Sequence, residues 1–245
     1  MGKVIVITGA GVGLGRALAR RFAKDGDTTI LLGRTFSKVK ALADELGEPH
    51  LAIECDVGLP DSVQAAFASI AEHHGKIDVL INNAALYEPF KLRDATDEQI
   101  LTTAQANYLG PIYMCRSALT MMEKGAQIIN ISTESVDDDF AMLSLYQSSK
   151  AGMERFSKSL MDEVEADGIR VCVVRAGPML DENKEMMNWA PEVGLKFFEE
   201  NMAIGRNLAE NPITNVDSVP GLFRMLIDLP PDFRIRHVIA GSRHP

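Results

Sequence analysis

The chain has 245 residues, of which 46% are hydrophobic and 24% charged, a composition typical of a globular protein with a large core. A net charge of −9 argues against broad nucleic-acid binding, because neutralising phosphates requires clustered Lys and Arg. Its three scattered cysteines suggest neither a disulfide frame nor a metal site. The apolar run near the N-terminus is shorter than a signal peptide requires, and no stretch approaches ~20 apolar residues, so we expect a cytoplasmic protein.

Short β-branched runs alternate along the chain with longer amphipathic ones. Continuous apolar strands alternating with helices predict a parallel sheet covered on both faces, in a doubly wound α/β domain of about seven strands. The predicted strands are residues 3–8, 28–33, 51–56, 77–82, 126–132, 169–174 and 236–241. The predicted helices are residues 15–26, 36–47, 60–75, about 97–123 and 146–167.

A glycine-rich string, "TGAGVGLG" at residues 8–15, lies directly between the first strand and its helix. Gly9 permits a tight turn, Gly13 lets the backbone approach a pyrophosphate, and Gly15 allows the helix to pack closely on the strand. The helix N-terminus then offers free N–H groups and the positive end of a dipole. The alternative interpretation is a flexible turn.

In its glycine spacing, this string resembles the first loop of the short-chain dehydrogenase/reductase family, which reads Thr-Gly-(x3)-Gly-x-Gly. The resemblance implies a single dinucleotide-binding oxidoreductase domain over residues 1–245. It extends to "CDV" (55–57), which would flank the adenine, and to "NNAA" (82–85), which would lie near the cofactor. The residues that would bind the cofactor are Thr8, Gly9, Gly13, Leu14, Gly15, Arg34, Thr35, Asp56, Val57, Asn83, Ala84, Tyr146, Lys150, Gly177 and Met179.

The end of the second strand indicates which dinucleotide is bound. NAD-preferring sites carry an Asp or Glu there to hold the ribose hydroxyls, whereas this chain has Arg34 and Thr35. A guanidinium binds a phosphate with two hydrogen bonds, so NADP(H) is favoured over NAD(H). Alternatively, Arg34 points to solvent.

Two copies of a Tyr-x3-Lys pattern occur, "YEPFK" (87–91) and "YQSSK" (146–150). The first contains Pro89 and follows a strand, so its end residues need not face each other. The second continues into a helical pattern, which makes Tyr146 and Lys150 neighbours one turn apart. A lysine cation lowers the pKa of a nearby phenol, and the pair can then act as a proton donor or acceptor at a carbonyl.

The resemblance assigns two more residues to the catalytic group. Thirteen residues before Tyr146 stands Thr133, which would hold the substrate oxygen, with Ser132 and Ser135 as alternatives. Asn107 in the long helix would hold a water linked to the lysine. Its carbonyl lacks a helical partner because Pro111, four residues later, has no N–H. A kink around a buried amide is the alternative.

The match is weaker after the sixth strand. The family has Pro-Gly followed four residues later by Thr, whereas this chain has Ala176 and Gly177 followed by Asp181. A carboxylate there would repel a pyrophosphate, so we expect the loop to run differently, with backbone contact near Met179. Residues 179–205 correspond to the family's substrate lid, and their methionines and aromatics suit an apolar or aromatic substrate, or a lid packed on its own core.

The sequence therefore predicts an NADP(H)-dependent oxidoreductase that interconverts a carbonyl and a secondary alcohol. Catalysis would depend on Asn107, Thr133, Tyr146 and Lys150, without a metal. The two long helices form the dimer and tetramer interface in the family, which implies a homodimer or homotetramer. The alternative function is a non-catalytic dinucleotide sensor on the same fold.

Overall fold

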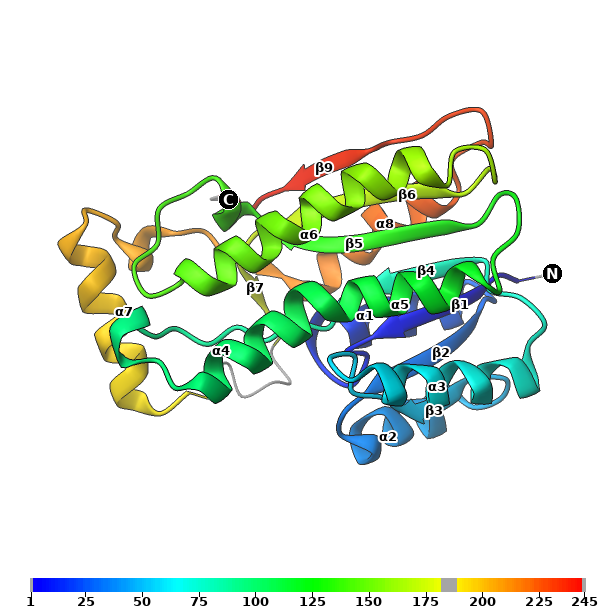
Figure 1. The fold of residues 1–245 in the computed structure, drawn as a ribbon, viewed down its shortest axis with the longest axis horizontal. Coiled ribbons are helices and arrows are strands. Elements are labelled where there is room, and N and C mark those ends of the chain that lie inside the picture. The colour runs from blue at the N-terminus through cyan, green and yellow to red at the C-terminus, as the bar shows by residue number, and fades with distance from the viewer. Residues whose placement is uncertain (1, 182–188, 244–245) are drawn as a thin grey trace.

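A seven-stranded parallel sheet forms the centre of the protein in a computed structural model that describes residues 2–181 and 189–243 (Figure 1). The strand order is β3-β2-β1-β4-β5-β6-β9, and every pairing is parallel. These strands are β1 Val4–Thr8, β2 Thr28–Gly33, β3 Leu51–Glu54, β4 Val79–Asn82, β5 Gln127–Thr133, β6 Arg170–Ala176 and β9 His237–Ala240.

Helices cover both faces of this sheet, because successive strand residues point to opposite sides. In β1, Val6 packs into the core beneath α3, α5 and α6, while Ile5 and Ile7 pack into the core beneath α1, α2 and α8. The helices are α1 Gly13–Lys24, α2 Phe36–Leu46, α3 Pro60–His73, α4 Asp97–Ala104, α5 Gly110–Leu119, α6 Ser144–Glu163, α7 Pro191–Ala203 and α8 Pro220–Ile227. The predicted doubly wound α/β fold is confirmed.

The predicted helix 97–123 is helical to Leu119 but is interrupted in its middle. Between α4 and α5 lies a π-helical turn, Gln105–Leu109, in which the N–H of Gly110 bonds the carbonyl of Gln105. Pro111 has no N–H to donate to Asn107, so the regular hydrogen-bond ladder cannot continue through this turn.

Some elements were not predicted, among them α7, which lies in the segment expected to be a lid. The others are α8, the short parallel pair β7 Met179–Leu180 with β8 Thr214–Asn215, and the 3₁₀ turns Leu92–Asp94, Glu134–Val136, Leu208–Glu210 and Val216–Ser218. No helix within residues 2–181 and 189–243 combines the length and apolarity needed to cross a bilayer.

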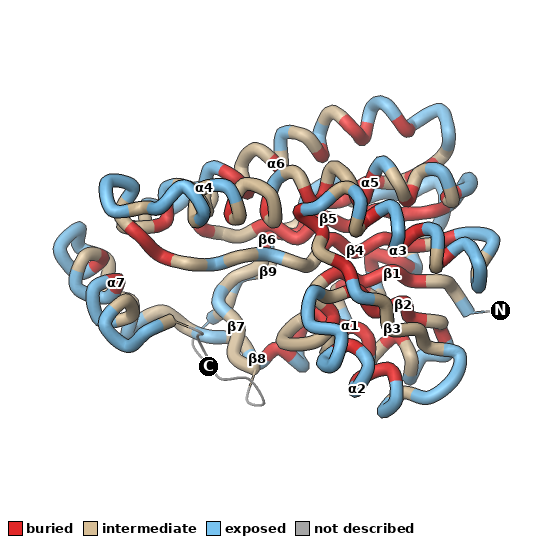
Figure 2. The backbone as a smooth tube through the Cα atoms, turned by 60° about the horizontal axis from the view of Figure 1, so that its bottom comes forward, coloured by how far each residue is buried: buried red, intermediate tan, exposed pale blue. Residues whose placement is uncertain are grey.

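The strand order reverses between β1 and β4, which defines the ligand crevice of such sheets. Chain order runs outward from β1 to β3 and then returns to β4 on the other side of β1. Ligands of open α/β sheets bind beyond the carboxyl ends of the strands at such a point. Helix α7 extends beyond one end of the sheet and is largely exposed (Figure 2).

Candidate active site

The glycine loop after β1 is tied to the end of β4 by Thr8 and Asn83. The buried Thr8 hydroxyl accepts hydrogen bonds from the N–H groups of Asn83 (3.0 Å) and Ala84 (2.9 Å). The Asn83 side chain donates to the carbonyls of Thr8 (2.9 Å) and Gly9 (3.2 Å). Thr8 and Asn83 therefore shape the loop.

The glycines of this loop meet different constraints. Gly9 and Gly13 have φ values of 64° and 55°, a region that favours glycine. A Cβ on Gly15 would lie 2.4 Å from the Gly9 carbonyl oxygen, so only glycine lets the helix pack this closely. A Cβ on Gly13 would meet no atom within 4 Å, which means that open space faces its backbone. Leu14 packs against the core beneath α1.

An anion already stands at the start of α1. The Asp181 carboxylate accepts hydrogen bonds from the N–H of Gly13 (2.8 Å) and from the Arg16 guanidinium (3.0 Å). Its side chain is only 9% exposed. The carboxylate oxygens stand in for those of a phosphate, so the donors at this loop fit the phosphate group of a dinucleotide.

The end of β2 carries an exposed cation. Arg34 and Thr35 follow β2 and are exposed, and Arg34 makes no hydrogen bond or ion pair within the described ranges. Thr35 precedes α2, whose first turn contains no acidic residue. Asp56 accepts a hydrogen bond from the N–H of Gly58 (2.9 Å), and the adjacent Val57 is buried.

The predicted catalytic pair lies on α6, which packs against β5. Lys150 is 3% exposed, and its ammonium donates to the carbonyl of Ile131 (2.7 Å). Burial lowers the pKa of Lys150 to about 8, while the charge of Glu154 opposes this shift. Burial raises the pKa of Tyr146 to about 12, and a hydrogen bond with Thr133 opposes this shift. In the protein alone the phenol is therefore protonated at neutral pH.

Three hydroxyls near the end of β5 differ in their partners. Ser132 donates to Glu154 (2.5 Å), which is held by two hydrogen bonds of 2.8 Å from Arg175. Ser135 is buried and lies 3.0 Å from the Thr133 hydroxyl. Thr133 is the one of the three whose hydrogen bond affects the pKa of Tyr146. Of the three, Thr133 is therefore the hydroxyl that is linked to Tyr146.

Asn107 lies in the π-helical turn and is fully buried. Its side chain makes two hydrogen bonds with the backbone of Leu86: it accepts one from the Leu86 N–H (2.7 Å) and donates one to the Leu86 carbonyl (2.8 Å). The side chain thus positions the segment after β4, and the backbone carbonyl is the group affected by Pro111.

A residue that the sequence analysis set aside, Tyr87, lies against Tyr146. The ring centroid of Tyr87 is 4.8 Å from that of Tyr146, and the rings meet edge to face at 72°. Trp189 packs on Tyr87 (5.2 Å between centroids), and its indole N–H donates to the Tyr87 carbonyl (2.9 Å). Phe197 of α7 completes this aromatic cluster. Lys91 pairs instead with Glu200, so "YEPFK" forms no second Tyr–Lys pair.

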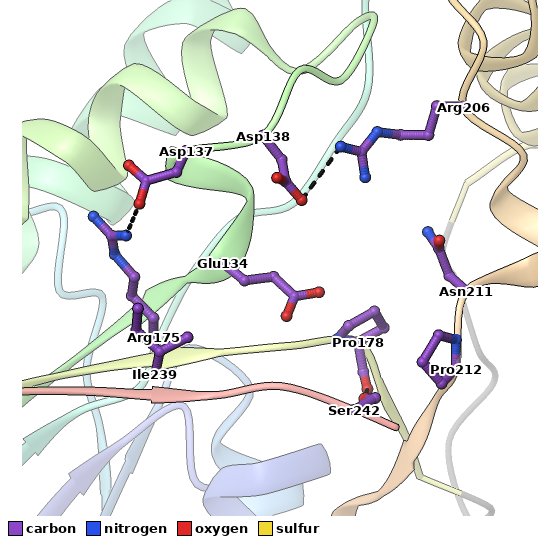
Figure 3. Close-up of a pocket in the computed structure, with 10 residues that line it drawn as sticks. All are labelled: Glu134, Asp137, Asp138, Arg175, Pro178, Arg206, Asn211, Pro212, Ile239 and Ser242. Atoms are coloured by element: carbon purple, nitrogen blue, oxygen red, sulfur yellow. Dashed lines mark hydrogen bonds and ion pairs between the residues drawn. The ribbon is translucent and has the colours of Figure 1, made fainter. Parts of the chain in front are cut away.

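A charged cavity of about 360 Å³ lies at the carboxyl ends of β6 and β9 (Figure 3). Arg175 pairs with Asp137, and Arg206 pairs with Asp138 (3.2 Å). Gly177 lies against its wall, because a Cβ there would be 2.9 Å from a carboxylate oxygen of Glu134. The cavity is lined by Glu134, Asp137, Asp138, Arg175, Pro178, Arg206, Asn211, Pro212, Ile239 and Ser242.

The predicted lid, residues 179–205, is described only in part, since 182–188 lie outside the described residues. Met179 is in β7, and its neighbour Pro178 accepts a hydrogen bond from the N–H of Thr214 (3.0 Å). The part of the chain that the structure describes contains no group of three or more His, Cys, Asp or Glu placed to hold a metal ion.

Comparison with known proteins gives consistent results. Residues 3–189 match the short chain dehydrogenase family. The chain is 31% identical over 207 residues to the 3-oxoacyl-[acyl-carrier-protein] reductase of Mus musculus, covering 84% of this chain and 85% of the relative. It is 34% identical over 179 residues to carbonyl reductase family member 4 of Danio rerio, covering 72% and 76%. The structure superposes on an alcohol dehydrogenase from Thermococcus sibiricus, complexed with 5-hydroxy-NADP, with a TM-score of 0.82 at 22% identity, covering 100% of this chain and 99% of that one.

Proposed function

The chain belongs to the short-chain dehydrogenase/reductase family of NAD(P)-dependent oxidoreductases, and we propose that it reduces a ketone to a secondary alcohol with NADPH, or catalyses the reverse oxidation. The observation that carries this proposal is the half-buried Tyr146, which interacts with Thr133 and lies one helical turn from the buried Lys150. The glycine loop that begins α1 lies at the same edge of the sheet.

Each residue of this group has a distinct role. Bound NADP(H) supplies or accepts the hydride. Tyr146 carries the proton that the carbonyl oxygen gains, and its raised pKa keeps this proton in place until the oxygen becomes basic. Thr133 donates a hydrogen bond to the same oxygen. The Lys150 cation stabilises the phenolate that remains, and the Asn107 backbone carbonyl holds a water for its reprotonation.

The preference for NADP(H) rests on the charges at the end of β2. Arg34 is exposed and has no partner among the described residues, and no carboxylate stands at the first turn of α2. The N–H groups of that turn and the Arg34 guanidinium can bind a 2′-phosphate together.

The substrate we propose is a ketone with an apolar or aromatic group. Tyr87, Trp189 and Phe197 form an aromatic wall beside the phenol of Tyr146. Related proteins are named for reduction of 3-oxoacyl groups and of carbonyls, so an acyl thioester with a 3-oxo group belongs in the same test. We further expect a cytoplasmic homodimer or homotetramer that associates through α4, α5 and α6.

The test measures oxidation of NADPH and NADH by the purified protein with aliphatic ketones, aryl ketones and a 3-oxoacyl thioester. Tyr146→Phe should abolish turnover and leave the dissociation constant of NADPH nearly unchanged. Unchanged turnover in this variant would refute the role of Tyr146. Binding of NADPH without consumption across the panel would favour the sensor instead.

A further inference from the structure

The carboxylate of Asp181 lies where the phosphates of a dinucleotide would have to bind. Its oxygen is 2.8 Å from the Gly13 nitrogen and 3.0 Å from the Arg16 guanidinium. The side chain of Asp181 is 9% exposed and that of Arg16 21%, so the ion pair is largely shielded from water. Backbone N–H groups at this loop are the donors that hold a pyrophosphate in folds of this class.

We propose that Asp181 is a built-in competitor of the cofactor: in the free protein its carboxylate occupies the phosphate position, and binding of the dinucleotide requires it to leave. This inference rests on the proposed function, because it concerns the affinity of the same cofactor site. Asp181 thereby sets how tightly the enzyme holds NADP(H).

The competition follows from the electrostatics of two anions. One N–H of Gly13 can serve the carboxylate or a phosphate oxygen. If both anions remained within a few ångströms of each other, their repulsion would weaken binding, more so where water is excluded. Bound dinucleotide and the Asp181–Gly13 hydrogen bond therefore exclude each other.

The backbone before Asp181 holds the side chain at this loop. Met179 and Leu180 form β7, which pairs with Thr214 and Asn215 of β8. Because this short pair anchors the segment, the Asp181 carboxylate is held at the start of α1, although Asp181 lies 168 residues after Gly13 in the sequence.

A purely structural role for Asp181 makes a different prediction. Val12, the residue that precedes α1, makes no side-chain capping bond, so Asp181 supplies the cap from a distant segment. Loss of a cap lowers the stability of the free protein in either case. Only competition predicts that the same substitution tightens binding of the cofactor, so the two roles are separable.

The experiment compares wild type, Asp181→Asn and Asp181→Thr by calorimetric titration with NADPH, alongside melting temperatures of the free proteins. Asp217→Asn is the matched control, because it also removes one negative charge, but from an exposed residue. The charges of Asp181 and Asp217 both raise the pKa of Arg20 in α1. The Asp181 variants should bind NADPH about tenfold more tightly than wild type. Their free forms should melt about 2–4 °C lower. Asp217→Asn should match wild type in both measurements.

Equal or weaker NADPH binding by both Asp181 variants overturns the inference, and so does an equal gain in Asp217→Asn. If wild type and all variants bind neither NADPH nor NADH, the proposed function fails as well. A measurable but unchanged dissociation constant refutes only the competition. The Thr variant provides the comparison should the Asn variant fail to fold.

Discussion

The ring of Tyr87 stands edge-on to the ring of Tyr146, with 4.8 Å between their centroids. Two phenols in contact raise the question of which one takes part in chemistry. Burial and the neighbouring Tyr146 both raise the pKa of Tyr87, so its hydroxyl stays neutral at physiological pH. We interpret Tyr87 as a wall that orients substrate against Tyr146.

Replacing Tyr87 with Ala should lower kcat/KM for an aryl ketone about tenfold, chiefly through KM. The substitution removes an aromatic contact worth about 0.5–1.5 kcal/mol together with apolar area that the substrate would cover. Steady-state kinetics with matched aryl and short aliphatic ketones measure the effect, which should be smaller for the aliphatic substrate.

Tyr87→Phe is the control for this prediction, because it keeps the ring and removes only the hydroxyl. It should behave like wild type. A large loss of kcat in Tyr87→Phe would instead assign a chemical role to that hydroxyl and contradict the wall interpretation.

Lys150 should make the stability of the folded protein depend on pH. Its pKa is about 8 in the folded protein, against an ordinary value of 10.5. Between these values the unfolded chain binds more protons than the folded one, so this residue makes the free energy of unfolding rise with pH from 8 to 10.5. Lys150→Met should lack this dependence and should also lack turnover.

The measurement is urea unfolding of wild type and Lys150→Met at pH 7 and pH 10.5. Taking the difference between the two proteins cancels the other titrating groups. From pH 7 to pH 10.5, this difference should shift in favour of wild type by about 3 kcal/mol at most. A difference independent of pH would mean that the lysine titrates normally when folded.

The three hydroxyls at the end of β5 can be separated by their effects on turnover. Thr133→Ala should lower kcat about 100-fold, the usual effect of losing one donor to a developing oxyanion. Thr133→Ser should restore most of the activity, because it keeps the hydroxyl. Single-turnover rates at saturating NADPH measure this step without product release.

Ser132→Ala is the matched control in the same strand. The Ser132 hydroxyl donates a hydrogen bond to Glu154, which also accepts one from Arg175. Loss of this hydroxyl should therefore lower the free energy of unfolding by about 1 kcal/mol, with little change in kcat. A larger kcat loss in Ser132→Ala than in Thr133→Ala would reverse the assignment.

The sequence could predict the sheet and most of its helices because those signals are local. Continuous β-branched runs and the glycine string between β1 and α1 depend only on neighbouring residues. Helix α8 was missed because it is short, Pro220–Ile227, and begins with Pro-Gly. Helix α7, Pro191–Ala203, was missed as well, because its segment was interpreted only as a lid. The π-helical turn depends on how the ladder relaxes around Pro111, which periodicity does not describe.

The site was predicted less completely, because its missing members depend on long-range contacts. Asp181 was recognised as a departure from the family pattern, but its hydrogen bond from the Gly13 N–H joins residues that are 168 positions apart in the sequence. Tyr87 was set aside because Pro89 breaks its apparent pairing with Lys91, and only the packing of the β4 loop on α6 brings it to Tyr146. Local pattern could identify the helix that carries Tyr146 but not what covers it.

Cofactor preference gives the remaining prediction, because Arg34 is the exposed cation at the end of β2. Arg34→Ala should raise the dissociation constant of NADPH about tenfold, since a charge-assisted hydrogen bond to phosphate is lost. Binding of NADH, which lacks the 2′-phosphate, should change by less than about twofold. Lys40→Ala on α2 is the control, because Lys40 is engaged with Asp44. Equal weakening of both dinucleotides by Arg34→Ala would show that Arg34 does not read the 2′-phosphate.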